Sequence, residues 1–469
     1  MTGRAVTSLG QVCFPYPVES AIRPACPLMG TAWAGQPYSR YRIRGYGYMR
    51  GKLARTAAGT AAVGAVMTAG LGPAQMAQAA SAAVQVPCSV SALTDDMSHA
   101  SSGEMLSLAP RCTYHLVRSL PVVSQDLTIL GNWATLERSY APGLPGFTII
   151  TVDSGTLAVS RLNFRHGNGA ISVNGFAKLT VNSGTFAGNR AADGGAISAS
   201  GTAFAIVIGA TFISNAAADG GAIYNHSALA SQVTDCTFIG NTATGAGGAI
   251  YDFSTGIDVT GSKFYRNKAG SGGAMWLSEA TGAGLSHVVV RGDGATGDGG
   301  GIYAASGSGL FLDSSKISSN RAGGRGGGIY APSAVESHIT GTEISGNRAA
   351  DGGGIYNSQS AITYFTNSTI SGNNASGDGG GIFNAGSFTI ASFTGSTISG
   401  NHAGVYGGGI YTQGEVDAAD TRTGRNTAAS GGGGIYGDAN ATVMLTNSPV
   451  LGNKPDNCEP PGSIAGCTG

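Results

Sequence analysis

Thr211-Phe-Ile-Ser-Asn215, with Gly220-Gly-Ala-Ile-Tyr224 after it, returns 26 residues later as Thr237-Phe-Ile-Gly-Asn241 with Gly247-Gly-Ala-Ile-Tyr251. The asparagine of this unit recurs at intervals of 25 to 28 residues, and Asp293 fills the one gap. The members of the asparagine column are Asn189, Asn215, Asn241, Asn267, Asn320, Asn347, Asn373, Asn401, Asn426 and Asn453. A self-similar unit of this length indicates a repeat architecture in which each unit buries its apolar face against its neighbours.

Apolar residues keep fixed places around each asparagine. Three residues before it stand Phe186, Phe212, Phe238 and Phe264, and later Val and Ile. Five residues earlier lies a second column, which starts at Val181 and stays apolar to its last member. A Gly-Gly-(Ala/Gly)-Ile box follows every asparagine but the last, with Met275 once in place of Ile. Short segments rich in Val, Ile, Phe and Thr between Gly and Asn are typical of strands and turns.

This spacing predicts an all-β, right-handed parallel β-helix of about eleven or more coils, each with three short strands and three turns. We expect the apolar columns to fill the interior of the helix. We expect the asparagine amides to bond their own turn and the amides of the coils above and below. Gly-Gly supplies a positive φ or a close backbone approach at a bend.

The chain divides into five segments. Residues 1–48 lack periodicity and read as a non-native extension, and residues 49–80 read as a signal peptide that begins at Met49 and ends with a small-x-small cleavage site. Residues 81–120 form an N-terminal cap with helical spacing near Leu93, residues 121–453 form the β-helix, and residues 454–469 form a C-terminal tail. Export without a membrane span after signal removal is therefore expected.

Cysteine positions agree with an oxidising compartment. Cys88 with Cys112 and Cys458 with Cys467 are close pairs that flank the repeats, and they are disulfide candidates. Cys236 has no evident partner and is expected to be a buried apolar residue.

The composition and the residue spacing limit the kinds of molecule that the protein is expected to bind. The chain has 26 basic and 26 acidic residues, and no basic run or patch is visible in the sequence, so nucleic acid is not an expected partner. The Cys and His spacings match no metal motif, and no cofactor or metal is expected.

An aromatic residue follows nine of the ten box positions, and Ser198 follows the first. If the box residue points inward, its neighbour points outward. These rings could stack on sugars or a protein partner, or mediate oligomerisation, or simply stack on each other and shield the sheet. The column consists of Tyr224, Tyr251, Trp276, Tyr303, Tyr330, Tyr356, Phe383, Tyr411 and Tyr436.

Acidic residues precede several Gly boxes, at Asp193, Asp219, Asp298, Asp351 and Asp378. An Asx turn on each coil is the preferred interpretation, and a cation between neighbouring carboxylates is the alternative. The other carboxylates are scattered, so the sequence predicts no catalytic residue.

The motifs Phe186-Ala-Gly-Asn189 with Gly194-Gly-Ala-Ile197, and their copies at Asn215 and Asn241, resemble the repeat of the polymorphic outer membrane proteins. The resemblance covers residues 160–453 and implies a pectin-lyase-like β-helix used at a cell surface, often in adhesion. That family ends in a membrane β-barrel, which does not carry over to this sequence. The layout also resembles secreted β-helix repeat proteins of high-GC Gram-positive (actinobacterial) bacteria.

Two functions remain open. The first is a secreted, extracellular scaffold without catalysis, which binds a polysaccharide or a surface protein. The alternative is an extracellular polysaccharide lyase or glycoside hydrolase of the pectin-lyase-like class, which rests on analogy of fold.

Overall fold

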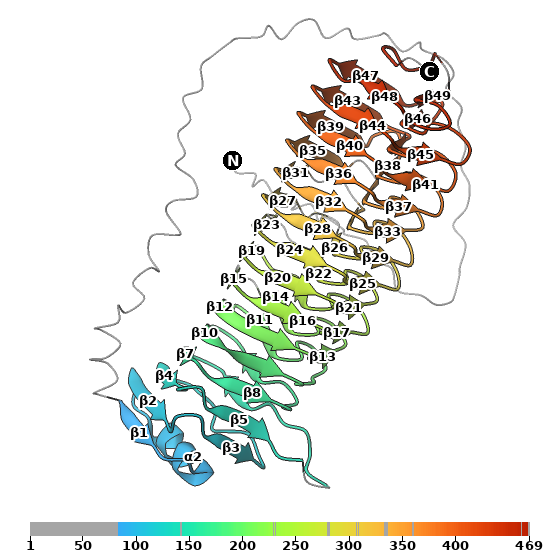
Figure 1. Cartoon of the computed structure of the whole chain (residues 1–469). Coiled ribbons are helices and arrows are strands. Elements are labelled where there is room, and N and C mark those ends of the chain that lie inside the picture. Colours follow the sequence, from blue (N-terminus) through green and yellow to red (C-terminus); the bar gives the residue numbers. More distant parts are fainter. Residues whose placement is uncertain are drawn as a thin grey trace, which may run out of the picture. The chain divides into compact units, whose positions relative to one another are not determined.

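The computed structural model describes residues 83–140, 143–227, 229, 231–278, 282–305, 307, 309–332, 336–358, 361–460 and 462–467. The proposed extension and signal peptide lie outside these residues. The described part is a parallel β-helix of about 14 turns with almost no α-helix, which confirms the predicted fold class. Successive coils stack in chain order, from blue to red in Figure 1.

A typical coil has four strand segments, where the sequence predicted three. One coil runs through β14 (Ile223–Ser227), β15 (Ser231–Thr234), β16 (Thr237–Ile239) and β17 (Thr242–Ala243). Strands β15 and β16 both belong to a 27-stranded sheet, sheet A, whereas β14 lies in a 13-stranded sheet B and β17 in a 9-stranded sheet C. Three sheets therefore surround the core, and sheet A receives two strands from each coil.

The extra bend in sheet A has a local cause. Between the two strands stands a residue with positive φ, such as Asp235 at 51° or His287 at 55°. This left-handed conformation turns the chain without breaking the stack, and Asp, Asn and Gly adopt it most readily. No apolar column marks the position, so the strand count could not be read from hydrophobic spacing.

The predicted columns stack as expected. Phe186 pairs with Phe212 and Phe212 with Phe238 in register. The rings of Phe212 and Phe238 lie 4.8 Å apart at 5°, and each is fully buried. Full burial of one such side chain contributes roughly 1.5–3 kcal/mol, so the interior of the helix supplies most of the favourable free energy.

The asparagine side chains bond from coil to coil. Oδ1 of Asn215 accepts hydrogen bonds from both the backbone N and Nδ2 of Asn189, each at 3.0 Å. Nδ2 of Asn215 donates to the carbonyl oxygen of Phe186 and to Oδ1 of Asn241. We call this buried series, in which Asp293 takes the place of one asparagine, the asparagine ladder. It satisfies backbone groups that the bend would otherwise leave unpaired.

Both ends are closed by disulfides. At the N-terminal end, β1 (Val84–Val86) precedes α2 (Val90–His99), whose Leu93 and Met97 are buried against the core. The sequence did not predict β1, which pairs with β2 (Glu104–Leu108). Cys88 bonds Cys112, and Cys458 bonds Cys467. Cys236 is buried and not disulfide-bonded, and burial raises the pKa of its thiol to about 12.

Among the described residues, no helix has the length and apolar character needed to cross a membrane.

Candidate functional site

The aromatic column lies on sheet B, one residue after the inward-facing box residues. Tyr224 pairs with Tyr251 in β18 (Ile250–Asp252), and Tyr251 pairs with Trp276 in β22 (Met275–Leu277). Neighbouring rings are 4.5 to 6.0 Å apart along the whole column. We call this series the aromatic ladder. Since each ring covers the next, ring stacking stabilises the outer face of the sheet.

The C-terminal half of the ladder is a packed cluster. Tyr330, Tyr356, Phe383 and Tyr411 are all buried. The guanidinium carbon of Arg325 lies 5.0 Å from the Tyr330 ring centroid and 5.2 Å from that of Tyr356. Nη2 of Arg325 also pairs with Oδ2 of Asp298 at 2.9 Å. These ring faces are occupied by neighbours and by Arg325, so this half has little surface for a ligand.

The N-terminal half is more open. Tyr251, Trp276 and Tyr303 are each half-buried and line a groove of about 680 Å³. Asp219 and the turns that contain Gly245, Gly270 and Gly297 form the other wall. The widest step of the ladder lies here, because the centroids of Trp276 and Tyr303 are 6.0 Å apart at 22°.

Hydroxyl groups in this groove are hydrogen-bond donors at neutral pH. Burial, with a smaller effect of nearby acidic groups, raises the pKa of Tyr251 to about 12. Burial and the charge of Asp298 also raise the pKa of Tyr303 above its usual value. The groove therefore combines partly exposed ring surface, neutral hydroxyls and the carboxylate of Asp219.

Two carboxylates of the acidic column before the Gly boxes do not form the predicted Asx turns, because each of them bonds the next coil instead. Oδ1 of Asp219 accepts a hydrogen bond from the backbone N of Ala246, one coil further on. Oδ1 of Asp351 likewise accepts from the backbone N of Asp378. These carboxylates join neighbouring coils, because the parallel stack presents a backbone N–H of the next coil to each of them. Among the described residues, no group of three His, Cys, Asp or Glu side chains is arranged to hold a metal ion.

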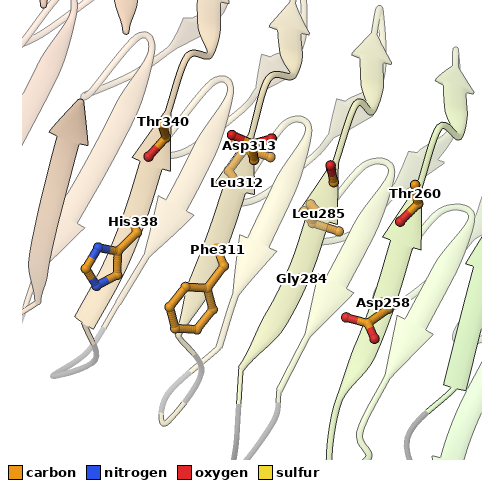
Figure 2. Close-up of a pocket in the computed structure, with 10 residues that line it drawn as sticks. Asp258, Thr260, Gly284, Leu285, Phe311, Leu312, Asp313, His338 and Thr340 are labelled. Carbon is orange, nitrogen blue, oxygen red and sulfur yellow. The ribbon is translucent and has the colours of Figure 1, made fainter. Parts of the chain in front are cut away.

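A second hollow lies on the outer face of sheet A, across β19 (Ile257–Thr260), β23 (Ala283–Ser286), β27 (Leu310–Asp313) and β31 (Glu336–Thr340). Figure 2 shows Asp258, Gly284, Phe311 and His338 in sequence across these strands. The hollow measures about 350 Å³, and Asp313 lies at its rim. It exists because Gly284 has no side chain, and a Cβ there would come within 2.6 Å of Oδ1 of Asp258.

The walls of this hollow are aromatic and acidic. Phe311 is 46% exposed, and its ring stacks on His338 at 5.5 Å and 6°. Nε2 of His338 lies 3.0 Å from Oε1 of Glu336. Burial raises the pKa of Asp258 above its usual range. A sugar ring could pack on Phe311 with its hydroxyl groups toward the carboxylates.

The sequence predicted no site at this hollow. Its residues occupy the position nine before the asparagine column, which reads Asp258, Gly284, Phe311, His338 and Tyr364. The sequence signal for the hollow is this column of aromatic and acidic residues around one glycine.

The fold and the stacked repeats define a parallel β-helix protein, and its two disulfides are of the kind that is typical of oxidising compartments. Residues 235–252 and 395–413 match the family described as the Chlamydia polymorphic membrane protein repeat. The chain therefore carries polymorphic membrane protein-type repeats within a parallel β-helix.

Similarity to solved structures is confined to the fold. The periplasmic alginate epimerase AlgG is 12% identical at a TM-score of 0.43, over 80% of this chain and 88% of that one. Tailspike protein 3 of bacteriophage CBA120 is 13% identical at a TM-score of 0.37, over 79% of this chain and 58% of that one. The A-module of mannuronan C-5 epimerase AlgE6 from Azotobacter vinelandii is 10% identical at a TM-score of 0.28, over 76% of this chain and 94% of that one. No curated protein sequence matches the chain significantly.

Proposed function

We propose that this protein is a secreted, non-catalytic β-helix scaffold that binds a neutral polysaccharide in the groove beside Trp276. The observation that carries the proposal is the partial exposure of Tyr251, Trp276 and Tyr303 together in one groove, beside Asp219. Aromatic faces pack against the C–H faces of sugars, and hydroxyl and carboxylate groups bond the sugar hydroxyls. The repeat type and the disulfides support a location at or outside a cell surface.

Replacing Trp276 by alanine is expected to weaken binding to such a polysaccharide about tenfold, because the largest ring surface in the groove is lost. The measurement is retention of the purified protein on cellulose, chitin and mannan, with a thermal midpoint for each variant. Trp276→Phe keeps a stacked ring and should retain most of the binding.

The matched control is Phe176→Ala, which removes a ring that is 83% exposed outside the groove and should leave binding unchanged. Loss of binding in Phe311→Ala instead of Trp276→Ala would move the site to the hollow on sheet A. Retention on none of the polysaccharides would contradict the proposal and direct the search to a surface protein.

The hollow on sheet A favours a second candidate function, hydrolysis or elimination on a polysaccharide. Asp258 has a raised pKa, and Asp313 stands two coils away, about 9–10 Å further along the axis. Two carboxyl groups that face a sugar are the usual acid and base of glycoside cleavage.

For this candidate we expect new reducing ends or unsaturated products from one of the tested polysaccharides. Product release should fall at least a hundredfold in Asp258→Asn and Asp313→Asn, since each removes an acid or base. Asp235→Asn, an exposed change at the bend of sheet A, is the control and should keep full activity. Retention without products in long incubations would leave the scaffold as the function.

A further inference from the structure

One face of the β-helix gathers basic side chains that the linear sequence disperses. The face consists of the second sheet A strand of each coil, the asparagine bend and the following sheet C strand. From residue 263 to residue 428 it carries nine of the 26 Lys and Arg residues of the chain. These are Lys263, Arg266, Lys268, Arg291, Lys316, Arg321, Arg348, Arg422 and Arg425, and all are exposed.

Acidic residues are scarce on this basic face. Between residues 263 and 428, its only exposed or half-exposed carboxylate in the described structure is Glu343, which pairs with Lys316 at 2.7 Å. That pair lowers the pKa of Glu343 below its usual value. Asp293 also belongs to these coils, but it is 1% exposed. The chain as a whole has no net charge, so this face is basic because basic residues gather on it and not because the protein is basic overall.

Register places some of these cations directly side by side. Arg321 in β29 (Arg321–Ala322) pairs with Arg348 in β33 (Arg348–Ala349). Lys268 in β21 (Lys268–Ala269) lies two coils before Arg321, with Gly294 between them. Neighbouring strands are about 4.8 Å apart. Like charges opposite each other destabilise a sheet, and an anion between them removes that cost.

The cations border shallow hollows that a ligand can enter. One hollow of about 370 Å³ is lined by Arg321, Arg348 and Asn374. A second, of about 380 Å³, is lined by Tyr265, Arg266 and Arg291. Each offers planar guanidinium groups, which bind carboxylates and sulfates through two parallel hydrogen bonds.

We propose that this basic face binds a linear anionic polysaccharide, which lies along the helix axis with its carboxylate or sulfate groups at successive coils. The two disulfides favour an oxidising compartment outside the cytoplasm, where such polymers occur and intracellular nucleic acid does not. Among its described residues the basic face carries one Tyr, Phe or Trp ring that is not buried, that of Tyr265, whereas surfaces for single-stranded nucleic acid carry several stacking platforms. This site shares no residue with the groove at Trp276, so either can fail without the other.

The test measures binding of the full protein to polygalacturonate and dextran sulfate, with neutral dextran and duplex DNA as comparisons, over a series of salt concentrations. Arg321→Gln/Arg348→Gln is expected to weaken binding to the anionic polysaccharides at least tenfold and to reduce the dependence on salt. The variant should leave the retention on neutral polysaccharides unchanged. Removal of two adjacent like charges should not lower the thermal midpoint.

Arg118→Gln/Lys178→Gln changes net charge equally at two exposed positions outside the basic face, and it should bind as the unchanged protein does. Equal losses in both double variants would show attraction by net charge alone and overturn the proposal. Binding to DNA as tight as to the polysaccharides, with the same loss in Arg321→Gln/Arg348→Gln, would also overturn it in favour of a nucleic-acid surface.

Discussion

Replacing Asp293 by asparagine is expected to stabilise the protein above pH 7 by a few kcal/mol. Asp293 is 1% exposed and occupies the single gap in the asparagine ladder. Its Oδ1 accepts hydrogen bonds from the backbone N and Nδ2 of Asn267, at 2.6 and 2.8 Å. Its Oδ2 is buried without a hydrogen-bond partner in the described structure. An asparagine at this position supplies an Nδ2 donor where the ladder lacks one.

The neighbouring coils show what that donor would reach. Nδ2 of Asn320 donates to Oδ1 of Asn347 and to the carbonyl oxygen of Val290. At Asp293 only the backbone N donates to Oδ1 of Asn320. A protonated carboxyl group restores one donor, whereas a carboxylate presents a second negative oxygen to ladder acceptors. Burial accordingly raises the pKa of Asp293 from its ordinary value of 3.8 to about 7.

Because the pKa of Asp293 is raised on folding, the stability of the protein depends on pH. Well below pH 3.8 the carboxyl group is protonated in both the folded and the unfolded chain. Between pH 4 and 7 the unfolded chain releases its proton while the folded chain keeps it, so the free energy of unfolding falls as pH rises. A pKa raised to about 7 corresponds to a loss of roughly 4 kcal/mol, complete above pH 7.

Urea unfolding of the unchanged protein and of Asp293→Asn, from pH 4 to 8.5, measures the effect. The difference between the two midpoints should be small at pH 4 and should widen up to about pH 8. Asp298→Asn is the matched control on the same coil, because its carboxylate pairs with Arg325 and accepts the backbone N of residue 325. That variant should lose stability at neutral pH. A constant difference for Asp293→Asn across the range would contradict a buried titrating carboxyl group.

Hydrophobic spacing was enough to predict the fold, because the columns at Phe212 and Val207 repeat at each coil and face one interior. The four-strand coil could not be predicted in the same way. Its bend at residues such as Asp235 depends on a positive φ, which several residue types adopt and which leaves no apolar periodicity.

The candidate sites were predicted less completely than the fold, because they depend on exposure and on contacts between coils. The aromatic ladder is visible in the sequence, but the exposure of its rings differs, because Arg325 covers Tyr330 and Tyr356 whereas no Lys or Arg of the described structure covers Trp276. The basic face has no run of charges along the chain. It forms only when residues about 27 positions apart, such as Arg321 and Arg348, come into register.

Replacing Asn347 by alanine is expected to destabilise the protein by about 4 kcal/mol, because it leaves several buried polar groups unpaired at once. Oδ1 of Asn347 accepts from the backbone N and Nδ2 of Asn320, at 2.9 and 3.1 Å. Nδ2 of Asn347 donates to the carbonyl oxygen of Ile317 and to Oδ1 of Asn373, each at 3.0 Å. Each buried group without a partner costs roughly 1–3 kcal/mol, and the four losses share partners and do not add fully.

Asn374→Ala is the matched control, one residue beyond the next ladder position and half-exposed on sheet C, and it should change the unfolding midpoint little. Asn347→Asp separates the loss of hydrogen bonds from the loss of volume. It keeps the Oδ1 acceptor and lacks the Nδ2 donor, so its stability should approach that of the unchanged protein at pH 4 and fall steeply toward pH 8. Equal destabilisation by Asn347→Ala and Asn374→Ala would mean that the ladder is a consequence of coil stacking rather than a cause of it. If the ladder stabilises the fold, the large loss of stability is confined to Asn347→Ala. Relative to the unchanged protein, Asn347→Asp should then lose stability as the pH rises, whereas Asp293→Asn should gain it.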